Sequence, residues 1–222
     1  MNYIYFILVL LTFSCGEDKH TKDVEENTYY SEYMQIYNAY DSIGPAKTIE
    51  SIDEYLTEFP NAQNAYIFKA WVLANNNQVA KINDVFETAL TYNITNVAIY
   101  EYWAALLLND STHLEKAKSI NEEGYKIDSQ DIVLDNNLTW ILLFENNVNE
   151  AFSNSLAVLN KDTINNFRYY RTAAVCAISV KKDSLYHYYN NSAIEYGQKD
   201  SLELEKFYKR SESVFELYKK LK

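Results

Sequence analysis

Segments that are apolar on nearly every side recur along this chain and alternate with amphipathic segments. The apolar segments span residues 66–74, 97–108, 138–144 and 173–180. The amphipathic segments span residues 79–92, 114–127, 148–159 and 184–196. A helix that is apolar all round has to be sandwiched between other helices, and each of these is shorter than the roughly 20 residues that cross a membrane. The alternation therefore predicts an all-α fold made of helix pairs.

The composition agrees with a helical fold. Only 4 Gly and 2 Pro occur among 222 residues, which is few for the many tight turns of an all-β protein. A hydrophobic content of 48% is too high for a disordered chain and is enough to bury a sizeable core. Two further helices are expected ahead of the alternating segments, one up to Tyr40 and one over residues 46–59, with a break at residues 41–45.

The helix pairs recur with a fixed period. Small or modest residues in the apolar segments are spaced 35, 34 and 35 apart, at Ala70, Ala105, Thr139 and Ala174. A second series in the amphipathic segments has the same spacing, at Ala89, Gly124, Val158 and Ala193. Only small side chains fit where paired helices cross closely, so this periodicity predicts a helical solenoid. A helical bundle without repeats is the alternative.

Residues 46–199 resemble the tetratricopeptide repeat (TPR) family in this period and in the small residues. Phe86 and Ala117 also match positions where the family often has an aromatic residue and an alanine. The resemblance implies a TPR-like α-α superhelix of about 4–5 helix pairs across residues 28–222. In such a superhelix the first helix of each pair lines a concave groove. The resemblance then implies these groove residues: Asn64, Trp71, Tyr102, Asn109, Asn136, Trp140, Arg168 and Arg171.

Two of these groove candidates carry a distinctive charge. Arg168 and Arg171 are two of only three arginines in a chain of net charge −11, and their spacing puts them on one helix face. Paired guanidinium groups suit a carboxylate of a partner peptide, although they could also pair with acidic side chains of the neighbouring repeat. Trp71 and Trp140 could be binding platforms, and buried packing is the alternative for both.

The first residues of the chain resemble a bacterial lipoprotein signal peptide. Residues 1–14 carry no charged side chain, residues 3–13 form an apolar run, and Leu11–Cys15 looks like a lipobox. The resemblance implies a signal peptide over residues 1–14, acyl chains such as palmitate on Cys15, and an acidic flexible tether over residues 15–27. It implies anchorage in the outer membrane of a Gram-negative bacterium, on the periplasmic or the surface face. The alternative is a buried N-terminal helix with a free cysteine.

The end of the chain predicts one more amphipathic helix. Leu204, Tyr208, Phe215 and Tyr218 line one face of residues 201–222, and we expect this helix to cap the repeats. Contact of its basic residues with anionic lipid is the alternative. Asp-Ser and Asp-Thr pairs near expected helix boundaries, at Asp41, Asp110, Asp162, Asp183 and Asp200, are typical of helix caps. They also match a short bacterial O-glycosylation motif.

Catalytic and metal-binding patterns are missing from the sequence. His20, His113 and His187 share no metal-ligand spacing, and Cys176 lies in a segment typical of a core. The sequence contains no Gly-rich phosphate loop, nucleophile elbow or zinc signature. We therefore expect no enzyme activity, no cofactor and no metal, and the net charge of −11 argues against nucleic acid as a partner.

The sequence as a whole predicts a non-catalytic, membrane-anchored lipoprotein scaffold. Its partner would be a protein or peptide bound in the TPR-like groove, within a cell-envelope complex. The alternative is a surface lipoprotein that binds a glycan through a platform of Tyr and Trp side chains, since the chain has 21 Tyr and 3 Trp.

Overall fold

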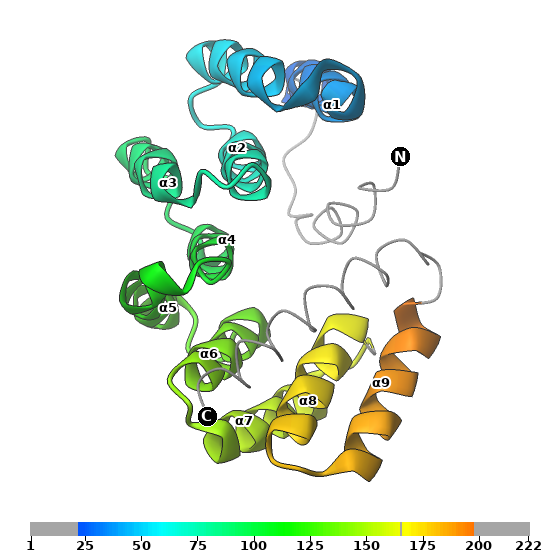
Figure 1. Cartoon of the computed structure of the whole chain (residues 1–222). Coiled ribbons are helices and arrows are strands. Elements are labelled where there is room, and N and C mark those ends of the chain that lie inside the picture. Colours follow the sequence, from blue (N-terminus) through cyan, green and yellow to red (C-terminus); the bar gives the residue numbers. More distant parts are fainter. Residues whose placement is uncertain (1–21, 165, 198–222) are drawn as a thin grey trace. The chain divides into compact units, whose positions relative to one another are not determined.

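The computed structural model describes residues 22–164 and 166–197 (Figure 1), with side chains from Tyr30 onward. Three predictions lie outside these residues: the signal peptide, the acylation of Cys15 and the C-terminal helix over residues 201–222. Within the described ranges, no helix is both long and apolar enough to cross a membrane.

The described residues form helices and no strands, which confirms the all-α prediction. The α-helices are α1 (Lys22–Glu58), α2 (Gln63–Asn75), α3 (Ile82–Thr91), α4 (Val97–Leu107), α5 (Leu114–Ile127), α6 (Ile132–Phe144), α7 (Val148–Lys161), α8 (Phe167–Ser179) and α9 (Asp183–Gly197). Short 3-10 turns, η2 (Val79–Lys81) and η3 (Ser111–His113), lead into α3 and α5. The two halves of α1 and the helices α2–α3, α4–α5, α6–α7 and α8–α9 follow one another as helix pairs.

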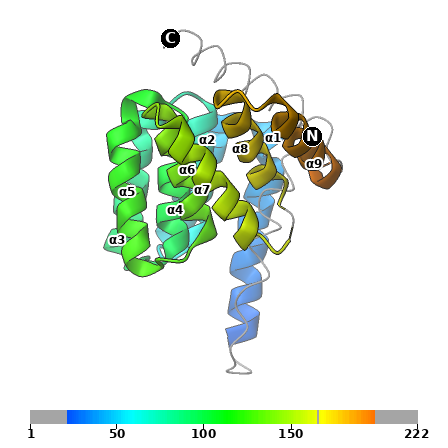
Figure 2. The ribbon, with the colours of Figure 1, turned by 90° about the horizontal axis from the view of Figure 1, so that it is seen from below.

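The helices belong to two compact units, which meet in the sequence between Gln130 and Asp131. In the N-terminal unit, α4 packs on both helices of the preceding pair, α2 and α3. Figures 1 and 2 show α3 and α5 on the same side of α2 and α4. In the C-terminal unit, α8 likewise packs on α6 and α7, and α9 packs along α8. In both units, the first helix of one pair therefore covers both helices of the pair before it.

The predicted break before residue 46 is a kink inside α1. Gly44 has φ 78° and ψ 170°, which is a backbone conformation that glycine adopts without a Cβ clash, and Pro45 follows it. The hydroxyl of Thr48 donates a hydrogen bond of 2.8 Å to the Gly44 carbonyl and closes the first turn of the second half. At its other end α1 begins at Lys22, so residues 22–27 are helical where the sequence predicted tether.

Buried side chains confirm the period of the second helices. Ala89, Val158 and Ala193 are at most 1% exposed, and Gly124 is also buried. In the first helices Ala70, Thr139 and Ala174 are buried as well.

The remaining member of the first-helix series requires a correction. Ala105 is half-exposed, and its neighbour Ala104 is 0% exposed. The whole buried pattern of α4 agrees with this register, which makes the first-helix spacing 34, 35 and 35 for Ala70, Ala104, Thr139 and Ala174. With two adjacent alanines, the sequence alone left the rotation of α4 undecided by one residue.

Helix caps follow the predicted Asp-Ser/Thr pairs only in part. The Asp110 carboxylate accepts from the Thr112 amide at 2.9 Å, while Asp41 lies inside α1. The caps of α6 and α8 come from residues that the motif missed. Asp131 accepts from the Leu134 amide at 2.8 Å, and Asn166 accepts from the Arg168 amide at 3.1 Å.

Candidate functional site

In each of the two units the first helices carry half-buried residues at corresponding positions of the repeat, and we call these positions the first-helix row of that unit. Each position is counted from the buried small residue of the same helix, which is Ala70, Thr139 or Ala174. The positions are Asn64 and Trp71 on α2, Asn136 and Trp140 on α6, and Arg168 and Arg171 on α8. All six are half-buried, so each has one side on the helix packing and one side open. On α4 the corrected register replaces the expected pair by the half-buried Ala98, Ala105 and Leu108 and by Glu101, which is buried.

The two expected residues of α4 lie elsewhere. Tyr102 is half-buried and packs against the N-terminal core, one position away from the row. Asn109 lies beyond the end of α4, where its side-chain amide donates to the Leu106 carbonyl at 3.0 Å. Asn109 therefore helps to close the end of a helix.

The arginine pair of α8 is built around one aromatic ring. The guanidinium carbon of Arg168 lies 5.6 Å from the centroid of the Phe167 ring, and that of Arg171 lies 4.9 Å from it. Both distances are in the range of cation–π attraction. The ring also packs closely against the end of α9, since a Cβ placed on Gly197 would lie 3.2 Å from Phe167 Cγ. One fixed ring thus holds two cationic groups close together.

A hydrogen-bond acceptor lies on the neighbouring first helix, α6. The amide oxygen Oδ1 of Asn136 is buried and accepts no hydrogen bond within the described residues. A buried acceptor left in this way costs about 1–3 kcal/mol. One turn further along α6, the half-buried Trp140 ring lies 6.5 Å from Phe144. Since α6 and α8 pack against each other, the C-terminal unit carries an amide, an indole and two guanidinium groups on adjacent helices.

The N-terminal unit carries an aromatic group around Trp71. The indole lies edge-on to Tyr40 of α1 at 5.4 Å and stacks on Phe68 at 5.8 Å. Next to them Tyr33 is 4% exposed, and its hydroxyl has no hydrogen-bond partner among the described residues. Burial, followed by the nearby Tyr37 hydroxyl, raises the pKa of Tyr33 well above its ordinary value. Trp71 is only half-buried in this packing, whereas Trp103 of α4 is fully buried.

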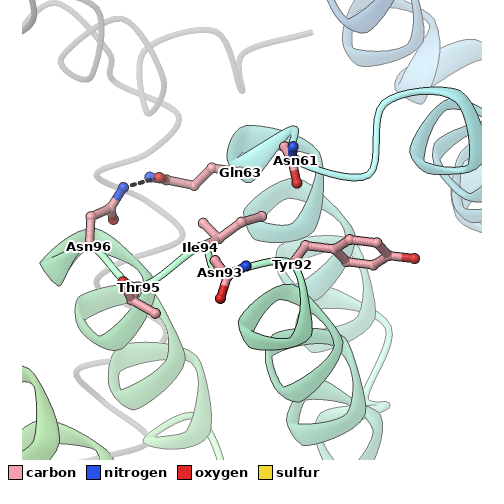
Figure 3. A pocket seen from close by; sticks show the side chains of 7 residues that line it. All are labelled: Asn61, Gln63, Tyr92, Asn93, Ile94, Thr95 and Asn96. Atoms are coloured by element: carbon pink, nitrogen blue, oxygen red, sulfur yellow. Dashed lines mark hydrogen bonds between the residues drawn. The ribbon is translucent and has the colours of Figure 1, made fainter.

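A shallow polar pocket of about 510 Å³ lies between two loops of the N-terminal unit (Figure 3). Its lining residues are uncharged: Asn61, Gln63, Tyr92, Asn93, Ile94, Thr95 and Asn96. The side-chain amide of Asn96 donates to Gln63 Oε1, which links the start of α4 to the start of α2. None of these lining residues was predicted from the sequence as part of a site. The only available signal was the amide-rich composition of two turns, which is also typical of ordinary loops.

The groups that could support metal or thiol chemistry are not assembled in the described residues. No group of three or more His, Cys, Asp or Glu side chains comes close enough there to hold a metal ion. The Cys176 thiol is fully buried, and burial raises its pKa to about 12. Its thiolate, the reactive form, is therefore rare at neutral pH.

Comparisons with known proteins agree on the fold. No protein-family model and no curated protein matches the sequence. A solved TPR protein from Thermus thermophilus superposes with a TM-score of 0.66 at 14% identity and covers 84% of this chain and 98% of its own. MamA from Desulfovibrio magneticus RS-1 superposes with a TM-score of 0.56 at 11% identity and covers 78% of this chain and 97% of its own. The predicted TPR-like fold is thereby confirmed.

Proposed function

We propose that this protein is a non-catalytic scaffold that binds a protein or peptide partner through the first-helix row of its C-terminal unit. The observation that carries the proposal is the pair Arg168 and Arg171, which share the Phe167 ring on α8. Guanidinium groups bind carboxylates through two parallel hydrogen bonds. Two of them in a chain of net charge −11 form a local site for an acidic group of a partner.

The neighbouring residues supply contacts of other kinds. Asn136 offers a buried acceptor that a backbone amide of a bound peptide would satisfy. Trp140 offers a half-exposed aromatic surface on the same helix. A short acidic segment with one apolar side chain matches this combination of charge, amide and ring.

The test measures the affinity of this protein for a partner. The partner is first identified by affinity purification from gently solubilised native membranes. We expect the variant Arg168→Lys with Arg171→Lys to keep the charge, lose the paired hydrogen bonds and weaken binding by about tenfold or more. The variant Lys47→Arg with Lys81→Arg also exchanges one cation for the other at two exposed positions of the N-terminal unit, and it is the matched control. Equal affinity of the arginine variant and the unchanged protein would refute the assignment.

We further propose that the scaffold is a lipoprotein anchored in the cell envelope of a Gram-negative bacterium, in its outer membrane. The support is the order of an apolar run, Ser14-Cys15 and an acidic stretch in the sequence. Mass spectrometry of the purified protein should find a mature terminus at an acylated Cys15, and Cys15→Ala should move the protein out of the membrane fraction. An intact Met1 terminus in native membranes would contradict this.

A glycan is the second candidate ligand, and the uncharged pocket of the N-terminal unit favours it. Side-chain amides that both donate and accept suit the hydroxyl groups of a sugar, and Tyr92 supplies a ring that is 44% exposed. Isothermal titration against a panel of neutral polysaccharides should then give heat that Gln63→Ala with Asn96→Ala abolishes. A protein scaffold alone would give no heat in this titration.

A further inference from the structure

Half-buried aromatic rings of the N-terminal unit come together from α1 and α2. The Tyr40 ring stands at 66° to the Trp71 indole and at 70° to the Phe68 ring, with centroid distances of 5.4 Å and 6.0 Å. The Tyr37 ring lies 5.0 Å from Phe68. Phe68 is 2% exposed, whereas Tyr37, Tyr40 and Trp71 are half-buried. We call these three half-buried side chains the aromatic surface.

Buried neighbours hold the rings of the aromatic surface in place. Tyr33, which is 4% exposed, lies 6.4 Å from the Tyr37 ring and 6.2 Å from the Phe68 ring. Burial raises the pKa of Tyr33, and several neighbouring tyrosines, among them Tyr102, add to this effect. Tyr102 of α4 therefore comes close to the same group. Rings that are already ordered lose little conformational entropy when a ligand binds.

The net charge of the chain lies entirely in the part that carries the aromatic surface. Residues 22–130 hold 7 Lys, no Arg and 17 Asp and Glu, which is a net charge of −10. Residues 131–222 hold 12 Lys and Arg and 12 Asp and Glu, which is a net charge of zero. Asp41, which follows Tyr40 directly, is one of the exposed acids. The field around the N-terminal unit therefore attracts cations and repels acidic segments.

Aromatic faces attract the same kind of ligand at short range. The face of an aromatic ring is negative, and a cation within about 6 Å of the ring centroid is attracted to it. This chain already uses the interaction, since Lys116 Nζ lies 5.3 Å from the Trp103 ring and Lys182 Nζ lies 4.5 Å from the Phe152 ring. A guanidinium group is planar and more weakly hydrated than an ammonium group, so it stacks better on aromatic rings.

We propose that the aromatic surface binds a cationic side chain of a partner peptide, with arginine preferred over lysine. The acidic field of the N-terminal unit attracts the basic segment, and the rings of Tyr40 and Trp71 hold the guanidinium group. This inference goes beyond the proposed function, because it adds a second ligand chemistry on the other unit. The pair Arg168 and Arg171 takes an acidic group, whereas the aromatic surface takes a basic one.

Isothermal titration of the full chain with short peptides tests the ligand class. The first probe is an acetylated and amidated pentapeptide in which two arginines alternate with three glycines. The second probe replaces both arginines by citrulline, which has nearly the same shape without the charge, and the third replaces them by lysine. At about 0.15 M salt, where exposed charges are screened, we expect the arginine peptide to bind about tenfold or more tightly than the citrulline peptide, with the lysine peptide between them. Equal affinity for arginine and citrulline, or no binding of the arginine peptide, would overturn the proposal.

Variants of the full chain test where the arginine peptide binds. Trp71→Leu should weaken binding by about tenfold, whereas Tyr40→Phe keeps the ring and should stay within about twofold. Trp140→Leu removes the half-buried tryptophan of the C-terminal unit and is the matched control, which should bind as the unchanged chain does. Tyr40→Leu serves as the second test if thermal unfolding shows that Trp71→Leu does not fold. Equal losses in Trp71→Leu and Trp140→Leu would contradict the site.

The arginine pair provides a further control that separates the two proposals. Arg168→Lys with Arg171→Lys should leave the affinity for the arginine peptide unchanged, whatever it does to binding of an acidic partner. A loss of arginine-peptide binding in this variant would place the peptide away from the aromatic surface and overturn the inference.

Discussion

Two adjacent alanines in α4 allow a strict test of how the helices pack. Ala104 is 0% exposed, and Ala105 is half-exposed. One residue along an α-helix is a rotation of about 100°, so the two methyl groups point in different directions from the same turn. Substituting each by leucine adds the same apolar group to the same helix, and leucine has nearly the helix propensity of alanine.

The expected free energies differ because the space around the two residues differs. Ala104 belongs to the core cluster with Ala70, Phe86 and Trp103. A leucine at position 104 has to displace these neighbours, which costs about 1–3 kcal/mol of unfolding free energy. A leucine at position 105 extends into the open row, and its effect should lie within about 0.5 kcal/mol.

Urea unfolding followed by tryptophan fluorescence measures the difference. A Trp140→Phe background removes the tryptophan of the C-terminal unit, so that the signal comes from Trp71 and Trp103 of the N-terminal unit. For a unit of roughly this size each kcal/mol also shifts the thermal midpoint by about 4–8 °C. Equal destabilisation by Ala104→Leu and Ala105→Leu would refute the register derived from burial.

Three further outcomes are expected. Thr139→Val should lower the unfolding free energy by about 1 kcal/mol in a denaturant titration, because the fully buried hydroxyl donates to the Asp135 carbonyl at 3.1 Å and accepts from the Asn154 amide at 2.9 Å. Asp131→Ala should cost a similar amount, about 1 kcal/mol, through loss of the α6 cap, and no change in the midpoint would contradict that role. Cys176 should resist thiol reagents in the folded protein at pH 8. Since burial raises its pKa from 9.0 to about 12, its contribution to stability is complete below about pH 9 and is lost as the pH rises towards 12; rapid labelling at pH 8 in native buffer would contradict the burial.

The positions of the helices were accessible from the sequence for a physical reason. Helices that are apolar on all sides, such as α4 and α6, have one possible environment, between other helices. Their alternation with amphipathic helices then showed which helices form pairs. Because Gly and Pro are few, the sequence offered few other positions for turns. The break in α1 was equally clear, because Gly44 and Pro45 are adjacent and both disfavour a continuous helix.

The caps were harder to predict because the same residue types serve several purposes. Aspartate next to serine or threonine favours a helix start, yet Asp41 lies in the interior of α1. Asn166 caps α8 without that motif, by accepting from the Arg168 amide. A cap depends on the backbone angles of one residue, and those angles follow from how the flanking helices pack rather than from the local residue types.

The half-buried positions of the first helices were predictable on those helices where the small residue from which they were counted is itself buried. On α2 and α6 the buried residues Ala70 and Thr139 have no adjacent alanine that would change the rotation, and on α8 both Ala173 and Ala174 are buried. Counting from the chosen residue reaches half-buried positions on all three helices. On α4 the count started from the wrong alanine.

An error of one residue is large on a helix because it turns the predicted face by more than a quarter of a turn. It replaced Glu101 and Leu108 by Tyr102 and Asn109, although the predicted start of the helix at Val97 was correct. A binding surface is therefore less determined by sequence periodicity than the fold that carries it. The repeat can still be recognised when a position is uncertain by one residue, whereas the side chains that face a partner are then assigned wrongly.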